Sequence, residues 1–296
     1  MGDNIHDNVS LNKINWFPGH MNKAIKKIKE RLKLVDIILE IRDARSPLIT
    51  GNKELFQQTR QKSRLIVINK KNLADPNIVN LWEEWFQKQG TPFIFINCFD
   101  KASLKEIINK SRAVIVDRIK ESNPEKEITT KQKIKLMVIG LPNTGKSTII
   151  NGLAKRNATK VADKPGQTQH QLWVKVDKDI EILDTPGIMP PIINKHEHGL
   201  WLAALNAIPD RIVSPEISAV YVVEHLIKTK SIPFQQIYKI ESFELDLIST
   251  LDNIAKTRGY IQKGGIYDYD RVYKAVLGDF RSGKLGLISF GIPPVK

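Results

Sequence analysis

A glycine-bounded motif at residues 140–147 constrains the fold more than any other feature of the sequence. Its residues, GLPNTGKS, match G-x-x-x-x-G-K-[ST]; an apolar run at 135–139 precedes them and a helical pattern at 148–154 follows. In this context the backbone N–H groups of the loop and the start of the helix point at one anionic pocket. The motif predicts a nucleotide-phosphate site in which Lys146 reaches the β- and γ-phosphates and acts in catalysis, while the Ser147 hydroxyl ligates Mg²⁺. The predicted nucleotide contacts here are Asn143, Thr144, Gly145, Lys146, Ser147 and Thr148.

The first two thirds of the chain alternate short apolar runs with helical patterns. The runs are rich in Val, Ile and Leu without strict polar alternation, which is typical of strands buried on both faces of a parallel sheet. They lie at 35–41, 65–68, 93–96 and 135–139, with a further pair at 172–176 and 181–183. Helical patterns lie at 53–61, 77–89 and 104–121. The alternation predicts an α/β fold with a doubly wound, mostly parallel sheet.

Helical patterns dominate after residue 190. They lie at 200–207, 219–228, 243–258 and 269–280. We therefore expect a nucleotide-binding domain over residues 1–200, followed by a small all-α domain over residues 201–296 that docks on a partner. Aromatic residues such as Trp201 and Tyr260 are expected mainly in the core of the second domain. Its basic residues near glycines fit either RNA phosphate contacts or a solvated surface.

A second, acidic motif supplies the metal anchor that a phosphate loop needs. The run at 181–183 leads directly into Asp184-Thr-Pro-Gly187, a D-x-x-G sequence. In such a motif Asp184 holds Mg²⁺ through water and the Gly187 N–H contacts the γ-phosphate. Between the two motifs, Thr168 offers a hydroxyl that completes the Mg²⁺ shell in the triphosphate state and belongs to the catalytic set. The predicted metal ligands are Ser147, Thr168 and Asp184.

Basic residues outnumber acidic ones and are unevenly distributed. The chain has 46 Lys and Arg against 32 Asp and Glu, a formal net charge of +14. Only 12 of the basic and 10 of the acidic residues follow residue 205, so the excess lies in the first two thirds. Part of it forms the polar face of a helical pattern at 21–33. This excess favours a polyanionic partner such as nucleic acid, although a solvated helix face explains the same residues.

Cysteine content and hydropathy exclude several classes of protein. A single cysteine, Cys98, excludes a disulfide framework and a multi-cysteine zinc site, and it fits a reducing compartment. No apolar run approaches the roughly 20 residues that span a bilayer. The polar residues 1–15 lack the apolar centre of a secretory signal. We expect a cytoplasmic protein with no membrane partner.

The candidate base-binding residues come before the phosphate motifs. Asn69-Lys70-Lys71-Asn72 follows the run at 65–68, and Asn97-Cys98 follows the run at 93–96. With the phosphate motifs, these sequences resemble translation-factor-like GTPases, in which a guanine-reading N-K-x-D motif follows D-x-x-G. Nothing after Gly187 fits N-K-x-D, so the order is that of circularly permuted GTPases. The resemblance implies GTP and GDP as ligands, with base contacts from Asn69, Lys70, Lys71, Asn72, Asn97 and Cys98.

Further motifs resemble one family of permuted GTPases. They are Trp16-Phe-Pro-Gly-His20-Met21, the Asp43-Ala-Arg45 turn with Pro47, and Pro142-Asn143. These are similar to the YlqF/RbgA family of ribosome biogenesis GTPases, and the likeness covers residues 14–286. It implies an enzyme that acts late in maturation of the large (50S) ribosomal subunit, binds its precursor and rRNA in the GTP state, and leaves after hydrolysis. We expect a monomer that does not bind DNA.

The resemblance also assigns two roles that the motifs leave open. The residue after D-x-x-G is Ile188, which cannot orient water as a glutamine does, and the family shares this replacement. The resemblance points instead to His20 as the catalytic group that orients water; the alternative is a histidine that caps the helix at 21–33. It also points to K⁺ near Asn143, where the alternative is an asparagine that braces the loop.

One base-site residue departs from the family pattern. Asn72 stands where the family has Asp. A carboxylate accepts from both the N1–H and N2–H of guanine, whereas an amide offers one acceptor oxygen and an NH₂ donor. A mispaired donor costs about 1–3 kcal/mol, or roughly ten- to more than a hundredfold in affinity. We expect GTP to remain the nucleotide, with weakened guanine selectivity.

Two other functions are compatible with parts of the sequence. A P-loop nucleotide kinase shares the phosphate loop, but the D-x-x-G and N-K-x-N motifs and the lack of an obvious arginine-rich lid argue against it. A nucleotide-gated RNA-binding scaffold with little turnover is compatible with Ile188 and Asn72. Hydrolysis with and without large subunits separates these functions.

Overall fold

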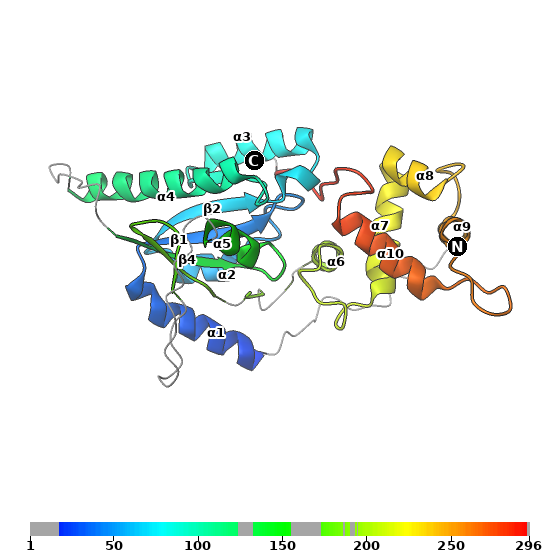
Figure 1. The fold of residues 1–296 in the computed structure, drawn as a ribbon, viewed down its shortest axis with the longest axis horizontal. Helices are drawn as coiled ribbons and strands as arrows, with labels where there is room; N and C mark the ends of the chain where they lie inside the picture. The colour runs from blue at the N-terminus through cyan, green and yellow to red at the C-terminus, as the bar shows by residue number, and fades with distance from the viewer. Residues whose placement is uncertain are drawn as a thin grey trace. The chain divides into compact units, whose positions relative to one another are not determined.

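The chain forms two compact units, each with its own core. The computed structural model describes residues 18–123, 133–154, 173–185, 187–189, 193 and 195–294. The first unit, called here the P-loop unit, holds the described residues up to 189 together with 291–294. The second, the helical unit, holds the described residues from 193 to 290. Figure 1 shows both units in ribbon form.

The P-loop unit is built on a six-stranded sheet (Figure 1). Its strands are β1 (Ile37–Asp43), β2 (Ser63–Asn69), β3 (Phe93–Phe95), β4 (Ile134–Gly140), β5 (Trp173–Lys175) and β6 (Ile180–Leu183). Their order is β3-β2-β1-β4-β6-β5. All neighbours pair in parallel except β5, which runs antiparallel to β6. This confirms the predicted mostly parallel α/β sheet.

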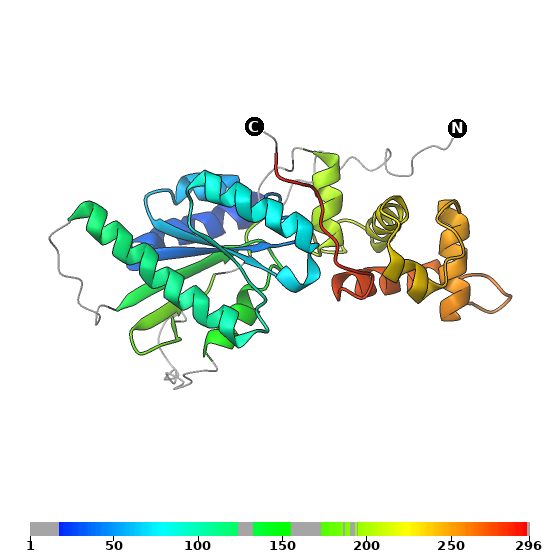
Figure 2. The same cartoon turned by 90° about the horizontal axis from the view of Figure 1, so that it is seen from above.

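Helices cover both faces of this sheet, as Figure 2 shows. On one face α4 (Lys101–Ser122) and α5 (Lys146–Ala154) bury Leu104, Ile107 and Ile149 against the central strands. The other face is covered by α1 (Pro18–Arg31), α2 (Lys53–Gln58) and α3 (Pro76–Gln89), which contribute to two further apolar clusters. Short 3-10 turns, η3 (Leu32–Leu34) and η4 (Lys71–Leu73), follow α1 and β2. The sheet is therefore doubly wound, as the alternation of patterns predicts.

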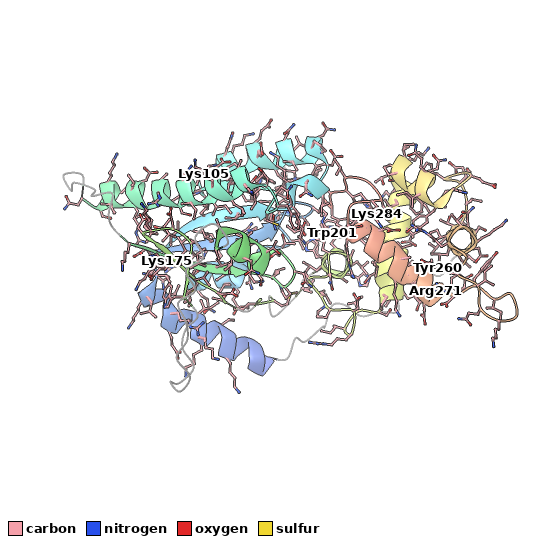
Figure 3. All side chains as sticks on the ribbon, viewed as in Figure 1. Lys105, Lys175, Trp201, Tyr260, Arg271 and Lys284 are labelled. Atoms are coloured by element: carbon pink, nitrogen blue, oxygen red, sulfur yellow. The ribbon has the colours of Figure 1, made fainter. Side chains whose placement is uncertain are left out.

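The helical unit contains α6 (His196–Ala204), α7 (Pro215–Lys228), α8 (Ile232–Tyr238), α9 (Leu247–Arg258) and α10 (Tyr269–Arg281). Its core combines residues of all five helices, including Phe234, Val272 and Phe280. Trp201 and Tyr260, labelled in Figure 3, pack at the border of this core, and Arg271 lies 4.4 Å from the Tyr260 ring centre. None of the helices in the described part of the chain is long and apolar enough to cross a membrane.

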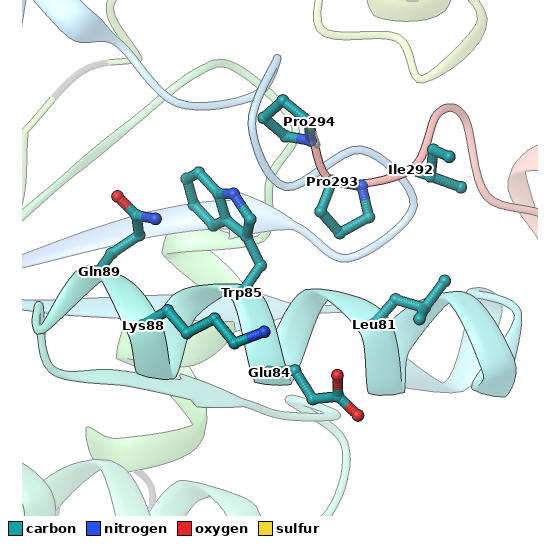
Figure 4. Close-up of a pocket in the computed structure, with 8 residues that line it drawn as sticks. All are labelled: Leu81, Glu84, Trp85, Lys88, Gln89, Ile292, Pro293 and Pro294. Atoms are coloured by element: carbon teal, nitrogen blue, oxygen red, sulfur yellow. The ribbon is translucent and has the colours of Figure 1, made fainter. Parts of the chain in front are cut away.

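The unit boundaries differ from the expected division at residue 201. The helical unit includes α6, because that helix packs against α7. The final residues return to the P-loop unit, where Ile292 and Pro293 face Leu81 and Trp85 of α3 across a hollow of about 430 Å³ (Figure 4). Spatial packing, rather than sequence position, thus assigns residues 291–294.

Candidate functional site

The phosphate loop occupies the tight turn between β4 and α5. Gly140 and Gly145 have φ angles of 152° and 101°, which favour glycine. A Cβ on Gly140 would lie 2.5 Å from the carbonyl oxygen of Ile41, so the neighbouring strand leaves no room for a side chain. Inside the loop the buried Thr144 hydroxyl donates to the Leu141 carbonyl at 3.0 Å. The motif glycines are therefore required by backbone geometry.

Lys146 begins α5 and is held inside this loop. Its Nζ donates to the Leu141 carbonyl oxygen at 2.7 Å, and the residue is only 8% exposed. Burial lowers the pKa of Lys146 to about 8, although the nearby Asp184 carboxylate acts in the opposite direction. Ser147 and Thr148, the next two residues, are exposed at the start of the helix. A buried ammonium and accessible hydroxyls at a helix N-terminus suit a phosphate chain.

Asp184 directly follows β6, and one of its carboxylate oxygens has no hydrogen-bond partner among the described residues. This oxygen, Oδ1, is buried. The next residue is fixed, since the Thr185 hydroxyl donates to the Val138 carbonyl at 2.6 Å. An orphaned carboxylate oxygen together with the Ser147 hydroxyl fits the oxygen ligands that Mg²⁺ prefers. Thr168, the third predicted metal ligand, lies outside the described residues.

Gly187, the last residue of D-x-x-G, lies directly against the phosphate loop. A Cβ there would lie 2.9 Å from the backbone nitrogen of Pro142. The following residue, Ile188, donates its N–H to the Gly140 carbonyl at 3.1 Å. The Ile188 side chain is 1% exposed and packs in the cluster that contains Ile28. The position after D-x-x-G is thus a core position.

Asn69 connects the two predicted base-binding sequences to the phosphate loop. It is fully buried at the end of β2. Its Nδ2 donates to the Thr144 carbonyl at 3.0 Å, and its Oδ1 accepts from the Cys98 N–H at 3.1 Å. Gly145 leaves room for this amide, because a Cβ at Gly145 would lie 2.2 Å from the Asn69 Nδ2. Residues distant in the sequence therefore meet at one edge of the sheet.

Lys70 adopts a left-handed conformation, with φ of 65°, and reaches across to the phosphate loop. Its Nζ donates to the Asn143 carbonyl at 2.7 Å and pairs with Asp43 Oδ2 at 2.8 Å. Asp43 is buried at the end of β1 and also binds the buried guanidinium of Arg45. Burial alone would raise the pKa of Asp43, but the charges of Arg45 and Lys70 hold it well below its usual range.

Asp43 is therefore a positioning residue that the motif analysis did not assign. The resemblance named the Asp43-Ala-Arg45 turn but gave Asp43 no role. The signal in the sequence is the pair of opposite charges, Asp43 and Arg45, at the end of an apolar run. Its link to Lys70 appears only when β1 and β2 pair in register, with Asp43 opposite Asn69.

The other predicted base-site residues have different surroundings. Lys71 pairs with Glu83 of α3 at 3.0 Å, so its side chain is directed toward that helix. Asn72 is exposed in η4. Asn97 accepts from the Phe99 N–H at 3.1 Å, and Cys98 is buried. The structure thus brings Asn69, Lys70 and Cys98 together and leaves Asn72 open to solvent.

His20 is the predicted catalytic residue farthest from these motifs in sequence. Its backbone lies in the first turn of α1. Its side chain lies outside the described part of the structure. Asn143, the predicted K⁺ neighbour, is exposed, has φ of 58°, and its carbonyl oxygen accepts the Lys70 hydrogen bond.

Comparisons with known proteins agree on one family. A sequence profile described as "50S ribosome-binding GTPase" matches residues 135–251. A "Ribosome biogenesis GTPase A" from Bacillus cereus is 38% identical over 95% of this chain and 94% of its own length. The relative of that name from Thermotoga maritima is 30% identical over 95% of each chain.

Solved structures give the same relationship. A GDP-bound YlqF structure matches 90% of this chain and 99% of its own, at 26% identity and a TM-score of 0.65. A GNP-bound YlqF from T. maritima gives a TM-score of 0.63 at 26% identity, over 91% and 98% of the two chains. Both similarities span the two units.

Proposed function

The chain belongs to the ribosome biogenesis GTPase A (YlqF/RbgA) family, and from this premise we propose that it hydrolyses GTP during assembly of the large ribosomal subunit. The observation that carries the proposal is the buried Asn69 amide, which hydrogen-bonds to both the phosphate loop and the Asn97-Cys98 loop. A guanine-reading sequence and a phosphate loop joined in this way suit a single nucleotide. The relatives named above are called ribosome biogenesis GTPase A, and this chain matches 94% and 95% of their lengths.

In the proposed reaction water attacks the γ-phosphorus and the bond from the γ-phosphorus to the bridging oxygen breaks, giving GDP and phosphate. Lys146 offsets negative charge on the phosphate chain, and the Gly187 N–H hydrogen-bonds the γ-phosphate. Ser147, Thr168 and Asp184 would hold Mg²⁺, which neutralises charge on the phosphates when bound. A K⁺ ion near Asn143 would add positive charge there.

His20 is proposed to orient the attacking water. The core position of Ile188 supports this proposal, because an apolar side chain buried in a core cluster cannot perform that step. His20 precedes the packed part of helix α1, so a partner that brings His20 to the γ-phosphate would couple docking to hydrolysis.

We propose the precursor of the large subunit and its rRNA as that partner. On α1, Ile28 is buried against the sheet, while Lys23, Lys26 and Lys27 are exposed. Exposed lysines beside the catalytic segment suit contacts with RNA phosphates. We expect the protein to act as a cytoplasmic monomer that binds in the GTP state and leaves after hydrolysis.

The test is GTP hydrolysis by the full chain with and without purified large subunits. We expect large subunits to raise the rate, and raised salt to remove that stimulation because phosphate contacts weaken with salt. Lys146→Ala is the control that should abolish turnover. Phosphoryl transfer to a small acceptor would identify a kinase instead. Salt-sensitive, GTP-dependent co-sedimentation without any turnover would identify a scaffold.

A further inference from the structure

A cavity of about 660 Å³ lies beside the phosphate loop within the P-loop unit. One part of its wall comes from the segment after β3, with Cys98, Phe99, Lys101 and Leu104. Another part comes from the first turns of α5, with Thr148, Asn151 and Gly152. Because Thr148 lies two residues after Lys146, this cavity adjoins the predicted phosphate site.

Where Gly152 meets Leu104, the lining of the cavity is closely packed. A Cβ on Gly152 would lie 2.7 Å from the Leu104 Cδ1, so α4 and α5 approach each other at a glycine. The wall segment is also tied to the phosphate loop, through the Asn69 bonds to Cys98 and Thr144. A ligand that spans the two would meet surfaces already fixed relative to each other.

Phe99 is the unusual member of this wall, because it is 79% exposed. Its backbone is fixed by a turn in which its N–H donates to Asn97 Oδ1 at 3.1 Å. The next residue, Asp100, caps α4 by accepting from Ala102 and Ser103. An aromatic ring is thus held on a rigid turn at the cavity, with most of its surface left uncovered. Stacking against a base is the interaction that such a ring offers.

The predicted base-reading residue also lacks one of the hydrogen-bond acceptors that guanine needs. Asn72 is exposed, and its amide offers one acceptor where guanine presents two adjacent donors. The nearby Asp75 is three residues further along the chain than Asn72, and its Oδ1 already caps α3 by accepting from the Asn77 N–H at 2.8 Å. Base affinity in this chain therefore needs a source other than a carboxylate.

We propose that Phe99 covers one face of the guanine base in this cavity and that this stacking supplies the affinity that Asn72 does not. The inference deepens the proposed function and rests on it. Stacking does not distinguish purines, so Phe99 sets affinity while Asn72 sets discrimination. Xanthine carries a carbonyl where guanine carries its amino group, and it pairs with both halves of the Asn72 amide.

The test is calorimetric titration of the full chain with GDP, XDP and inorganic tripolyphosphate. Phe99→Ala should weaken GDP and XDP alike, by about five- to a hundredfold, since stacking is lost. Its tripolyphosphate affinity should stay unchanged, and Phe99→Tyr should retain wild-type affinity for all three. Asn72→Asp should raise the ratio of GDP to XDP affinity by about tenfold or more.

Two results would overturn the inference alone. One is unchanged GDP affinity in Phe99→Ala; the other is a parallel loss of tripolyphosphate affinity, which would show a collapsed loop. Because the ring is exposed, the melting temperature of Phe99→Ala should match the wild type and report its folding. Failure of the wild-type chain to bind GDP would instead contradict the proposed function.

Discussion

At the scale of single residues, the site depends on buried polar side chains, each of which forms hydrogen bonds or ion pairs with two segments of the chain. Asp43 receives hydrogen bonds from Arg45 Nε and Nη2, at 3.0 and 2.9 Å, besides its ion pair with Lys70. A buried charge is tolerated only where such partners replace water. The orientation of Lys70 toward the phosphate loop therefore depends on a carboxylate that touches no nucleotide.

We predict that Asp43→Asn destabilises the protein by about 3–5 kcal/mol, because a buried guanidinium loses its anion. Urea unfolding measures this difference. Asp177→Asn is the matched control: Asp177 pairs with Arg112 at 3.0 Å, but both side chains are more than a third exposed. That variant should lose less than about 1 kcal/mol. Equal losses in the two variants would contradict a structural role for the buried pair.

His20→Ala should leave GDP affinity nearly unchanged and lower large-subunit-stimulated turnover by about tenfold or more, the scale of general-base effects. Hydrolysis with saturating large subunits measures it. Asn22→Ala, on the same helix, is the control and should keep wild-type turnover. Equal loss in both variants would assign this segment to docking and not to water orientation.

At the scale of elements, the loops at one edge of the sheet form the site while the strands fix their spacing. Gly140, Asp43 and Asn69 end β4, β1 and β2, which are adjacent and parallel. Parallel strands bring their carboxyl ends to the same edge, where ligands of α/β folds bind. A permuted chain order leaves this edge intact, because adjacency in the sheet does not depend on which motif comes first.

Gly145→Ala should lower GDP affinity by about tenfold or more, because the new Cβ would displace the Asn69 amide and break its hydrogen bonds. Titration with GDP measures the loss. Gly90→Ala is the matched control: Gly90 has φ of 68°, but nothing lies within 4 Å of the point where a Cβ would stand. It should cost about 1–2 kcal/mol of stability and no GDP affinity. Wild-type affinity in Gly145→Ala would contradict the proposed close approach.

The sequence predicts the helices and strands better than it predicts the tertiary contacts between them. Apolar runs locate the six strands that the structure describes, and most clearly the central strands β1, β2 and β4, whose two faces are buried. The pattern does not predict helix α8, since seven residues that include Pro233 carry too little periodicity. Helix α4 begins at Lys101 and not at 104, because Asp100 caps it. The Asp43–Lys70 pair and the exposure of Phe99 depend on strand register and tertiary packing, which no local pattern encodes.

At the scale of the whole molecule, the described residues pack into two units with separate apolar cores. The clusters around the sheet involve residues from 25 to 188, whereas the helical cluster involves residues from 201 to 290. Most of the net positive charge also lies before residue 205. Nucleotide binding and the basic surface of α1 therefore belong to the P-loop unit, and the helical unit contributes a separately packed body.

Separate cores predict that nucleotide binding stabilises the two units unequally. A ligand present at about 100 times its Kd stabilises the folded state that binds it by about 2.7 kcal/mol. The equilibrium constant for unfolding of that state then falls by about a hundredfold. Hydrogen exchange measured by mass spectrometry should therefore slow by up to about a hundredfold in β1 and β4 when GDP is added, for amides that exchange through unfolding of the P-loop unit. Amides of α7 and α10 should keep their rates, and Lys146→Ala should show no slowing anywhere. Equal slowing in both units would instead mean that they unfold as one cooperative body, with binding energy from the phosphate loop reaching the helical core.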